Sequence, residues 1–232
     1  MKQRGLLLVP FLFTVCCLLP SAKALAETAY MSPLEGLYLA VILDDMDEAV
    51  RWLDQGQDPN QADPEGDGCT VLTYARSTEM IELLLERGAD PNHLCPDGLT
   101  LLHTAVSAPY GPRIIPVILD HGGLVNARYQ DETPLHWSVT AWIEHASSDR
   151  PHADGAIIGL LAEGGADMDA PDGFGLTPLM IATQNDRPVL VGLLLNHGAD
   201  PGATDPEGRT ALDMALDLGF DEVVEVLSEA SK

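Results

Sequence analysis

The chain has 232 residues and is strongly acidic, with 36 Asp and Glu against 12 Lys and Arg and a formal net charge of −24 at pH 7. A surface of this sign repels phosphate groups and anionic lipids, so neither nucleic acid nor a membrane surface is expected as a partner. The acidity is consistent with simple solubility and equally with the steering of a basic protein partner.

Residues 1–26 have the pattern of a cleaved secretory signal peptide. Lys2 and Arg4 form a basic head, residues 6–19 an apolar run, and residues 24–26 a small-residue cleavage site. The run is short for a bilayer and contains Pro10, which disfavours a transmembrane anchor. Cleavage removes three basic residues and no acid, so the net charge becomes −27. We expect a mature chain of residues 27–232 that is periplasmic or secreted.

A short turn recurs through the mature chain at intervals of about 33 residues, most clearly as Gly88-Ala89-Asp90-Pro91-Asn92. Its glycine follows an amphipathic run such as residues 191–195, as expected where a helix ends in a left-handed residue. This period indicates a solenoid, in which each unit buries its apolar face only by stacking on its neighbours. The expected units are residues 32–64, 65–94, 95–127, 128–170, 171–204 and 205–232.

The start of each unit has the residues of a helix N-terminus, as in Thr177-Pro178-Leu179. Thr suits the N-cap, Pro suits the first helical position, and a His three positions after Thr can return a capping hydrogen bond. His103 and His136 occupy that last position, so we expect structural roles for them rather than metal ligation.

This combination of opening and closing motifs resembles ankyrin repeats. The clearest matches are residues 175–182 with 193–200, and residues 208–215, and the resemblance extends from about residue 32 to residue 228. It implies an all-α solenoid of about six stacked helix-turn-helix units, including the terminal caps, with short β-hairpin loops between the units. A single domain follows, since nothing in residues 27–232 resembles a Pro/Ser-rich linker.

Two units depart from the regular length. The second runs only from Thr70 to Gly88 and is shorter than the fifth, so its first helix or its inter-helix turn is expected to be trimmed. The fourth runs from Thr133 to Gly165 and is longer than the fifth, which places an insertion at about residues 143–155. Ser32 to Glu35 form a capping box for an N-terminal cap, and residues 222–229 suit a C-terminal cap.

Two cysteines, Cys69 and Cys95, lie in the mature chain, near the turns of adjacent units. An oxidising compartment allows them to form a disulfide, and the alternative is two unpaired, core-like thiols.

Little in the sequence points to catalysis. The insertion contains five residues that could ligate a divalent metal, but their spacing matches no helical or hairpin ligand pair, and an ordinary exposed loop is favoured. Phosphate-binding loops, nucleophile elbows and Cys-x-x-Cys pairs are absent from the sequence. We expect no catalytic, cofactor or metal site. The five insertion residues are Glu144, His145, Asp149, His152 and Asp154.

The resemblance implies that partners are bound by the hairpin tips and the concave face. Tyr129, Phe174 and Leu176 are the strongest candidates, because apolar groups on polar turns are typical interface anchors. The alternative is that they pack on a neighbouring hairpin. Trp137 is expected in the core, and Trp142 is expected to be exposed beside Asp131 and Glu132. The full set of candidates is Asp67, Asp97, Leu99, Tyr129, Gln130, Glu132, Trp142, Phe174, Leu176, Glu207 and Arg209, with Cys69 beside the second unit's Thr.

Two hypotheses follow, with a third well behind. The chain is a monomeric exported module that binds and supports or regulates another exported protein, or it is an inhibitor or immunity protein that occludes a basic active site. The third is a metal-dependent enzyme that uses the insertion.

Overall fold

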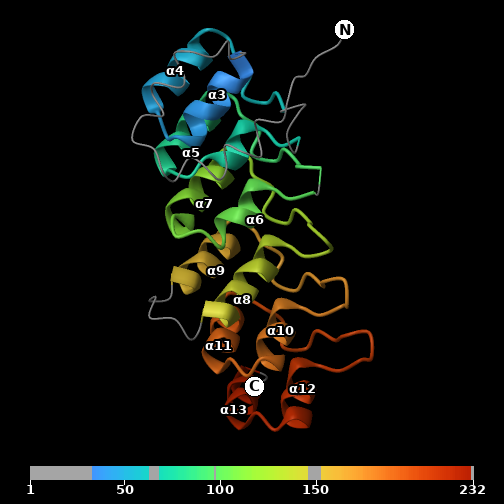
Figure 1. The fold of residues 1–232 in the computed structure, drawn as a ribbon. Helices are drawn as coiled ribbons and strands as arrows, with labels where there is room; N and C mark the ends of the chain where they lie inside the picture. The colour runs from blue at the N-terminus through green and yellow to red at the C-terminus, as the bar shows by residue number, and fades with distance from the viewer. Residues whose placement is uncertain (1–32, 63–67, 97, 146–152, 231–232) are drawn as a thin grey trace.

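The computed structural model describes residues 33–62, 68–96, 98–145 and 153–230. Within these residues the chain forms two parallel rows of helices, with long loops projecting from one side (Figure 1). The described part contains no β-strand, only isolated bridges at Tyr129–Glu132 and Thr204–Thr210, so the expected all-α solenoid is confirmed. The inner row, beside the loops, is α3 (Pro33–Ile42), η1 (Val71–Tyr74), α6 (Leu101–Ala105), α8 (Pro134–His145), α10 (Pro178–Gln184) and α12 (Ala211–Leu218). The outer row is α4 (Met46–Asp54), α5 (Thr78–Glu86), α7 (Gly111–Asp120), α9 (Ala153–Glu163), α11 (Pro188–Asn196) and α13 (Asp221–Ala230).

One apolar core runs between the two rows along the length of the stack. Equivalent positions in successive units are buried in the same way: Leu135 and Leu179 of the inner row are each 1% exposed, and Ile158 and Val191 of the outer row are fully buried. Each unit therefore covers the apolar face of the next, as the repeat period predicts. None of the described helices is long and apolar enough to cross a membrane.

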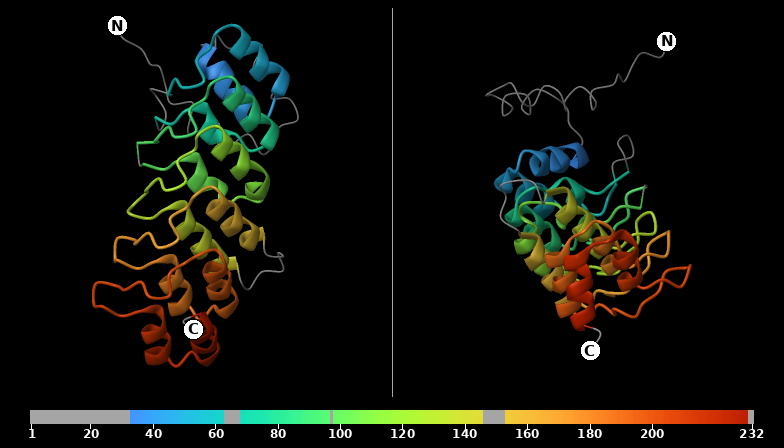
Figure 2. Two further views of the ribbon diagram at one scale, coloured as in Figure 1. Left: turned by 180° about the vertical axis from the view of Figure 1, so that it is seen from behind. Right: turned by 90° about the horizontal axis from the view of Figure 1, so that it is seen from below.

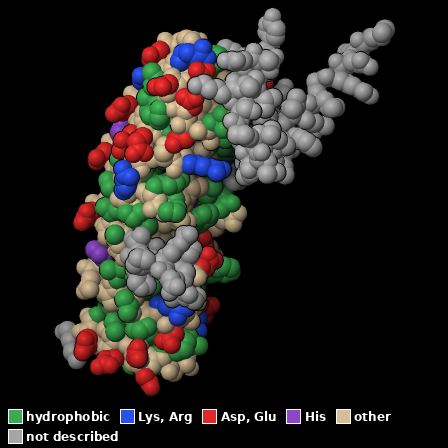
Figure 3. Space-filling model, turned by 60° about the vertical axis from the view of Figure 1, so that its left-hand side comes forward, with side chains coloured by type: hydrophobic (Ala, Val, Ile, Leu, Met, Phe, Trp, Pro, Cys, Tyr) green, Lys and Arg blue, Asp and Glu red, His purple; other side chains and the backbone are tan. Residues whose placement is uncertain are grey.

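The acidic residues are spread along the stack. Figure 3 shows the side of the molecule on which the outer helices lie. On this side, Asp and Glu side chains extend from one end of the stack to the other, and Lys and Arg are few. Charge dispersed in this way keeps that face soluble and does not form a single focused patch.

The second unit is irregular where its short sequence requires it. Its inner helix is reduced to η1, a 3₁₀ turn of 4 residues, which confirms the expected trimming. A disulfide joins Cys69, just before η1, to Cys95 in the next hairpin, with the two Cα atoms 4.6 Å apart and both side chains buried. The covalent bond links the second and third units where the inner row is thinnest.

The fourth unit absorbs part of its insertion by lengthening α8, which has 12 residues and continues to His145. Residues 146–152 lie outside the described residues, as does Ser32 of the expected N-terminal capping box. At the other end, α13 buries Val223 and Leu227 against the stack and exposes its acidic residues, as expected for the last helix.

A ladder of asparagine side chains joins the terminal turns of successive units. Asn60 Nδ2 donates to the carbonyl oxygen of Gly88 (2.8 Å), and Asn60 Oδ1 accepts from the backbone N–H of Asp90 (2.7 Å). Both orphan backbone groups at the end of the next unit are satisfied by one side chain. The same two bonds run from Asn92 to Gly122 and Leu124, and from Asn126 to Gly165 and Asp167.

The fourth rung of this ladder is an aspartate. Asp169 Oδ1 accepts from the backbone N–H of Asp200 (2.7 Å), but a carboxylate has no N–H to donate to the carbonyl of Gly198. Burial raises the pKa of Asp169, the Asp200 N–H lowers it, and the carboxylates of Asp200 and Asp167 raise it further. The ionised form is therefore disfavoured in the folded chain.

Replacing Asp169 by Asn should complete the ladder and stabilise the protein. We expect Asp169→Asn to increase the free energy of unfolding at pH 7 by about 1 kcal/mol, the contribution of one hydrogen bond. Because the folded-state pKa of Asp169 is raised, its carboxyl contributes stability below the unfolded pKa and loses it as the pH rises through the folded pKa. The advantage of Asn over Asp should therefore shrink in urea titrations at about pH 4.

Two further variants test whether charge or the missing donor limits this turn. Asp167→Asn removes a carboxylate from the same turn and keeps an oxygen that can accept the backbone N–H of Asp169. Asn126→Asp imposes the defect on the preceding rung and should destabilise by a similar amount. Equal gains from Asp167→Asn and Asp169→Asn would show that charge, and not the missing donor, limits this turn.

The disulfide should contribute strongly to stability. Its cysteines are 26 positions apart, and closing a loop of that length is worth about 3–4 kcal/mol on the loop-entropy model. Reduction, or Cys69→Ser with Cys95→Ser, should lower the free energy of unfolding by that amount. Denaturant titrations with and without reductant measure the difference, and the double serine variant should not respond to reductant. Two free thiols per native mature chain, counted by mass spectrometry, would contradict the bond.

Candidate functional site

The loops between units form a row along the inner side of the solenoid, which we call the hairpin edge (Figures 1 and 2). An aspartate at the base shapes the loop of the fifth unit: Asp172 Oδ1 accepts the backbone N–H groups of Phe174 and Leu176, each at 2.8 Å. Gly175 lies between them with φ of 80° in the left-handed region, which favours glycine. The turn is therefore fixed by its own backbone bonds, and the side chain of Phe174 is free to project.

The candidates in this loop lie differently. Phe174 is 83% exposed, the largest exposure among the exposed large apolar side chains of the described residues. Leu176 is partly buried and packs against the core, and Leu99 of the third unit is partly buried as well. Phe174 is thus an accessible aromatic side chain at the hairpin edge.

Tyr129 packs within the inner side of the stack. Its ring makes edge-to-face contacts with Trp137 (5.5 Å between centroids) and His103 (6.0 Å), and these two rings also meet (5.6 Å). Of the two alternatives left by the sequence, the structure favours packing against neighbours, with part of the Tyr129 ring still accessible. Trp137 is partly buried in this aromatic cluster, close to the core position expected for it.

The capping histidines behave as the sequence predicts. Nδ1 of His103 lies 2.7 Å from Oγ1 of Thr100, and Nδ1 of His136 lies 2.8 Å from Oγ1 of Thr133. Both side chains are fully buried, and burial lowers the pKa of both imidazoles, so they are neutral at pH 7. These contacts fix the N-terminal ends of the inner helices α6 and α8.

The hairpin of the fourth unit closes without glycine. Tyr129 and Glu132 exchange two backbone hydrogen bonds (2.9 Å each), and both Gln130 and Asp131 adopt positive φ, 50° and 66°. Burial raises the pKa of Glu132, the Asp172 carboxylate raises it further, and Trp137 opposes the shift. This tip therefore presents exposed polar and acidic groups beside the aromatic cluster.

The expectation that Trp142 joins this acidic tip is wrong. Trp142 is only 7% exposed, because α8 continues through it to His145 and the ring faces α9, close to Gly155. A position expected at the mouth of a loop is instead inside a helix and part of the core.

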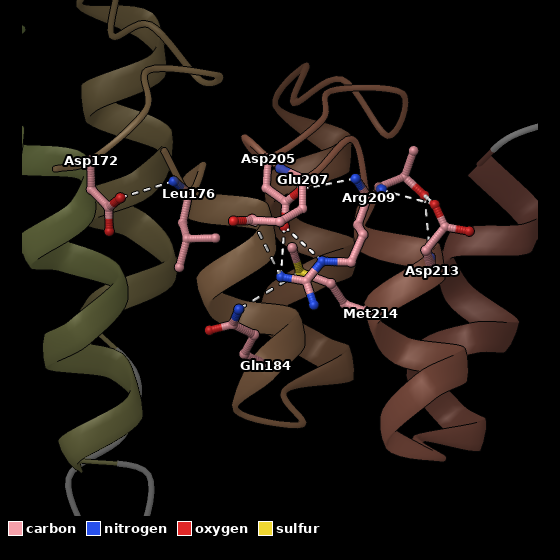
Figure 4. Close-up of polar contacts among 9 residues, drawn as sticks. Asp172, Leu176, Gln184, Asp205, Glu207, Arg209, Asp213 and Met214 are labelled. Atoms are coloured by element: carbon pink, nitrogen blue, oxygen red, sulfur yellow. Dashed lines mark hydrogen bonds and ion pairs between the residues drawn. The ribbon is translucent and has the colours of Figure 1, made fainter. Parts of the chain in front are cut away.

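The inner face opens into a shallow groove at the C-terminal end, with a depression of about 310 Å³. Figure 4 shows Arg209 of the last hairpin pointing toward Gln184 of α10 and Met214 of α12. The side chain of Asp205 is fully buried, and its Oδ2 accepts from Nε of Arg209 (2.9 Å) and lies 2.8 Å from a terminal nitrogen of the same guanidinium. Nε2 of Gln184 lies 3.7 Å from the sulfur of Met214. The depression is lined by Gln184, Arg209, Met214, Asp217 and Leu218.

Most of these lining residues are absent from the sequence-based candidate set, which contains only Arg209. A signal was present, since Gln184 and Asp217 are one repeat period apart and lie at the ends of the inner helices of successive units. Glu207 lies beside Arg209 in the last hairpin, with 3.7 Å between their charged atoms, so the structure brings these two candidates together.

Other candidates lie outside the described side chains, namely Asp67 and Asp97 of the hairpins and four of the five insertion residues (His145, Asp149, His152 and Asp154). Glu144 is exposed at the end of α8. In the described ranges no three His, Cys, Asp or Glu residues gather into a potential metal site.

The family model for ankyrin repeats in three copies matches residues 37–122, 76–150 and 144–232. The chain belongs to the ankyrin-repeat family. Ankyrin repeats are protein–protein interaction modules, and their fold is typically non-catalytic.

Curated relatives include a putative ankyrin repeat protein, FPV222, of Fowlpox virus (strain NVSL), 28% identical over 152 residues, which are 64% of this chain and 18% of the viral protein. The E3 ubiquitin-protein ligase KEG of Arabidopsis thaliana is 37% identical over 84 residues, which are 34% of this chain and 5% of the ligase. The chain thus spans less than a fifth of the length of either protein.

Solved structures agree over most of the solenoid. The ankyrin repeat domain of Bcl-3, a member of the IkappaB protein family, superposes with a TM-score of 0.71 and 28% identity over 84% of this chain and 85% of that one. The ankyrin repeat protein EF0377 gives 0.70 and 25% identity, covering 86% and 99%. A domain from Acinetobacter baumannii AYE gives 0.70 at 24% identity, covering 84% and 97%, which supports the fold alone.

The different environments of Phe174 and Tyr129 predict different effects of truncation. Phe174→Ala should change the free energy of unfolding by less than about 0.5 kcal/mol, as is usual at an exposed surface position. Tyr129→Ala should cost about 2 kcal/mol, because two ring contacts and partly buried area are lost. Urea unfolding of both variants tests this, and a large stability loss in Phe174→Ala would show that its ring is packed.

Proposed function

We propose that this protein is an exported, non-catalytic binding module that supports or regulates another exported protein through its hairpin edge and inner groove. The observation that carries the proposal is the exposed ring of Phe174 on a turn fixed by Asp172. An aromatic side chain on a rigid turn loses little conformational freedom on binding, which is the property of an interface anchor.

The surroundings of Phe174 suggest the chemistry of the partner. Acidic groups lie near Phe174 on the hairpins of the fourth and fifth units. The carboxylate of Asp172 in the fifth unit is close enough to Glu132 in the fourth to raise the pKa of Glu132. A partner with an apolar pocket for the ring and basic groups around that pocket complements this surface.

Export is supported by two independent features. Residues 1–26 have the basic, apolar and small-residue segments of a signal peptide, and the Cys69–Cys95 disulfide suits an oxidising compartment. Both features support a periplasmic or secreted location, and the partner would then be a protein of the same compartment.

An inhibitory or immunity role is the second candidate. The acidic groups of the inner side and its hairpins, Glu132, Asp172 and Asp217, are of the charge needed to occlude an enzyme with a basic active-site cleft. This role uses the same surface and differs in its effect on the bound enzyme.

The proposal predicts that binding depends on Phe174. Tagged protein purified from the exported fraction should capture a specific partner, identified by mass spectrometry, and Phe174→Ala should weaken its binding at least about tenfold. Val189→Ala is the matched control, since Val189 is 72% exposed at the start of outer helix α11.

The activity of the captured enzyme separates the two roles. Retained activity supports the accessory role, and abolished activity supports the inhibitory one. Equal binding by the wild type and Phe174→Ala, or no specific partner from the exported fraction, would overturn the proposed use of the hairpin edge.

A further inference from the structure

Arg128 links the hairpins of the fourth and fifth units. One terminal nitrogen of its guanidinium donates to the carbonyl oxygen of Asp131 at the tip of its own hairpin (2.8 Å), and the other donates to the carbonyl oxygen of Pro171 at the base of the next (2.9 Å). A guanidinium is planar and presents its donors in fixed directions. This one side chain therefore sets where the base of one hairpin lies relative to the tip of the other.

The same two hairpins also meet at their tips. A Cβ atom on Gly173 would lie 3.3 Å from the Cβ of Asp131, which is tighter than ordinary van der Waals contact. Glycine permits this close approach because it has no side chain. Asp131 is thus held twice, since its carbonyl accepts from Arg128 and its side chain lies beside Gly173 of the next hairpin.

The tip of the fourth hairpin depends on such support. Gln130 and Asp131 have φ of 50° and 66°, in a region that residues other than glycine rarely adopt. A conformation of this kind persists where surrounding contacts hold it. Backbone bonds between Tyr129 and Glu132 hold the two ends of the turn. Arg128 holds the carbonyl of Asp131 between them, so its loss should loosen the tip as well as the link.

The sequence provides this link in one unit of the repeat. When the units are aligned on their terminal turns, the position of Arg128 is occupied in the others by short or apolar side chains. None of these side chains can donate to two carbonyl oxygens. The link between the fourth and fifth hairpins is therefore a property of this chain and not of the repeat. The equivalent residues are Ala62, Leu94, Pro171 and Thr204.

We propose that the fourth and fifth hairpins act as one rigid two-loop platform for a binding partner, with Arg128 as the positioning residue that joins them. Phe174 on one loop and Gln130 on the other, both exposed, are then held at a fixed separation. A partner that contacts both loops loses little affinity to the ordering of those loops. The use of the platform in binding rests on the function proposed above, whereas the rigid link does not.

Amide exchange tests the link without any partner. Asp172, directly after Pro171, accepts the backbone N–H groups of Phe174 and Leu176, so a looser base should open these two bonds. Arg128→Gln and Arg128→Lys should each raise the exchange rates of these two amides with water, measured by NMR, about three- to fivefold, as expected for the loss of an exposed charged contact. Lys keeps the charge, but its single nitrogen cannot replace two guanidinium nitrogens.

Arg113→Gln is the matched control, since Arg113 is a 71% exposed arginine of α7 that lies 3.6 Å from Glu79. It should leave both exchange rates unchanged. The amides of α11 should exchange at the wild-type rate in every variant, because the link does not support the core. Wild-type rates for Phe174 and Leu176 in both Arg128 variants would overturn the link. Wild-type rates in Arg128→Lys alone would overturn it as well, by assigning the effect to charge.

Affinity for the partner identified through Phe174 tests the platform. Arg128→Lys should weaken the binding of that partner about three- to fivefold in isothermal titration. The same substitution should have little effect in a Phe174→Ala background, because Arg128 acts by holding the hairpin of Phe174. Equal losses in both backgrounds would overturn the positioning role, since Arg128 would then contact the partner itself. Binding that does not depend on Phe174 would overturn the use of the platform, while the exchange rates would still decide the link.

Discussion

The structure depends on one constraint: no unit can bury its own apolar face, so every unit must be held at a fixed offset from the next. Apolar packing between the rows supplies the attraction, but such contacts are non-directional. The asparagine side chains of the terminal turns supply the direction, because each satisfies one donor and one acceptor of the following unit and does so only at one offset. Core and ladder together fix both the distance and the orientation between units.

That offset sets the geometry of the hairpin edge. Each loop leads into an inner helix. Several of these helices start with a Thr cap, and in the third and fourth units a buried His contacts that Thr. In these units the spacing of the hairpin tips follows the spacing of the helices. Phe174 projects from a loop that is further held by Asp172. Phe174 is thereby positioned by bonds in its own loop and by the packing of units beneath it.

Much of this was accessible from the sequence, because it rests on local rules. Residues within a few positions of one another are enough to predict the helix caps and helix ends. The same local patterns predict the trimmed second unit and the period of the stack. The environment of Trp142 did not, since the pattern cannot say how far α8 continues into an insertion. Tyr129 was left between two alternatives, because its ring contacts come from two different units. The groove residue Gln184 was missed because its role depends on Arg209 and Met214 of the next unit, and such pairs are visible only once the units are stacked.

A linear stack also separates the ways in which its parts can change. In a compact domain most elements meet around one centre, whereas here each unit contacts only its neighbours along the stack. Phe174 is exposed on the hairpin of the fifth unit, so a substitution there should leave the packing of the other units unchanged. The ladder residues have the opposite property, because a change at Asn126 or Asp169 alters the join between two units and with it the relative position of two hairpins. The exposed positions can therefore vary one unit at a time, while the geometry that presents them is held in common.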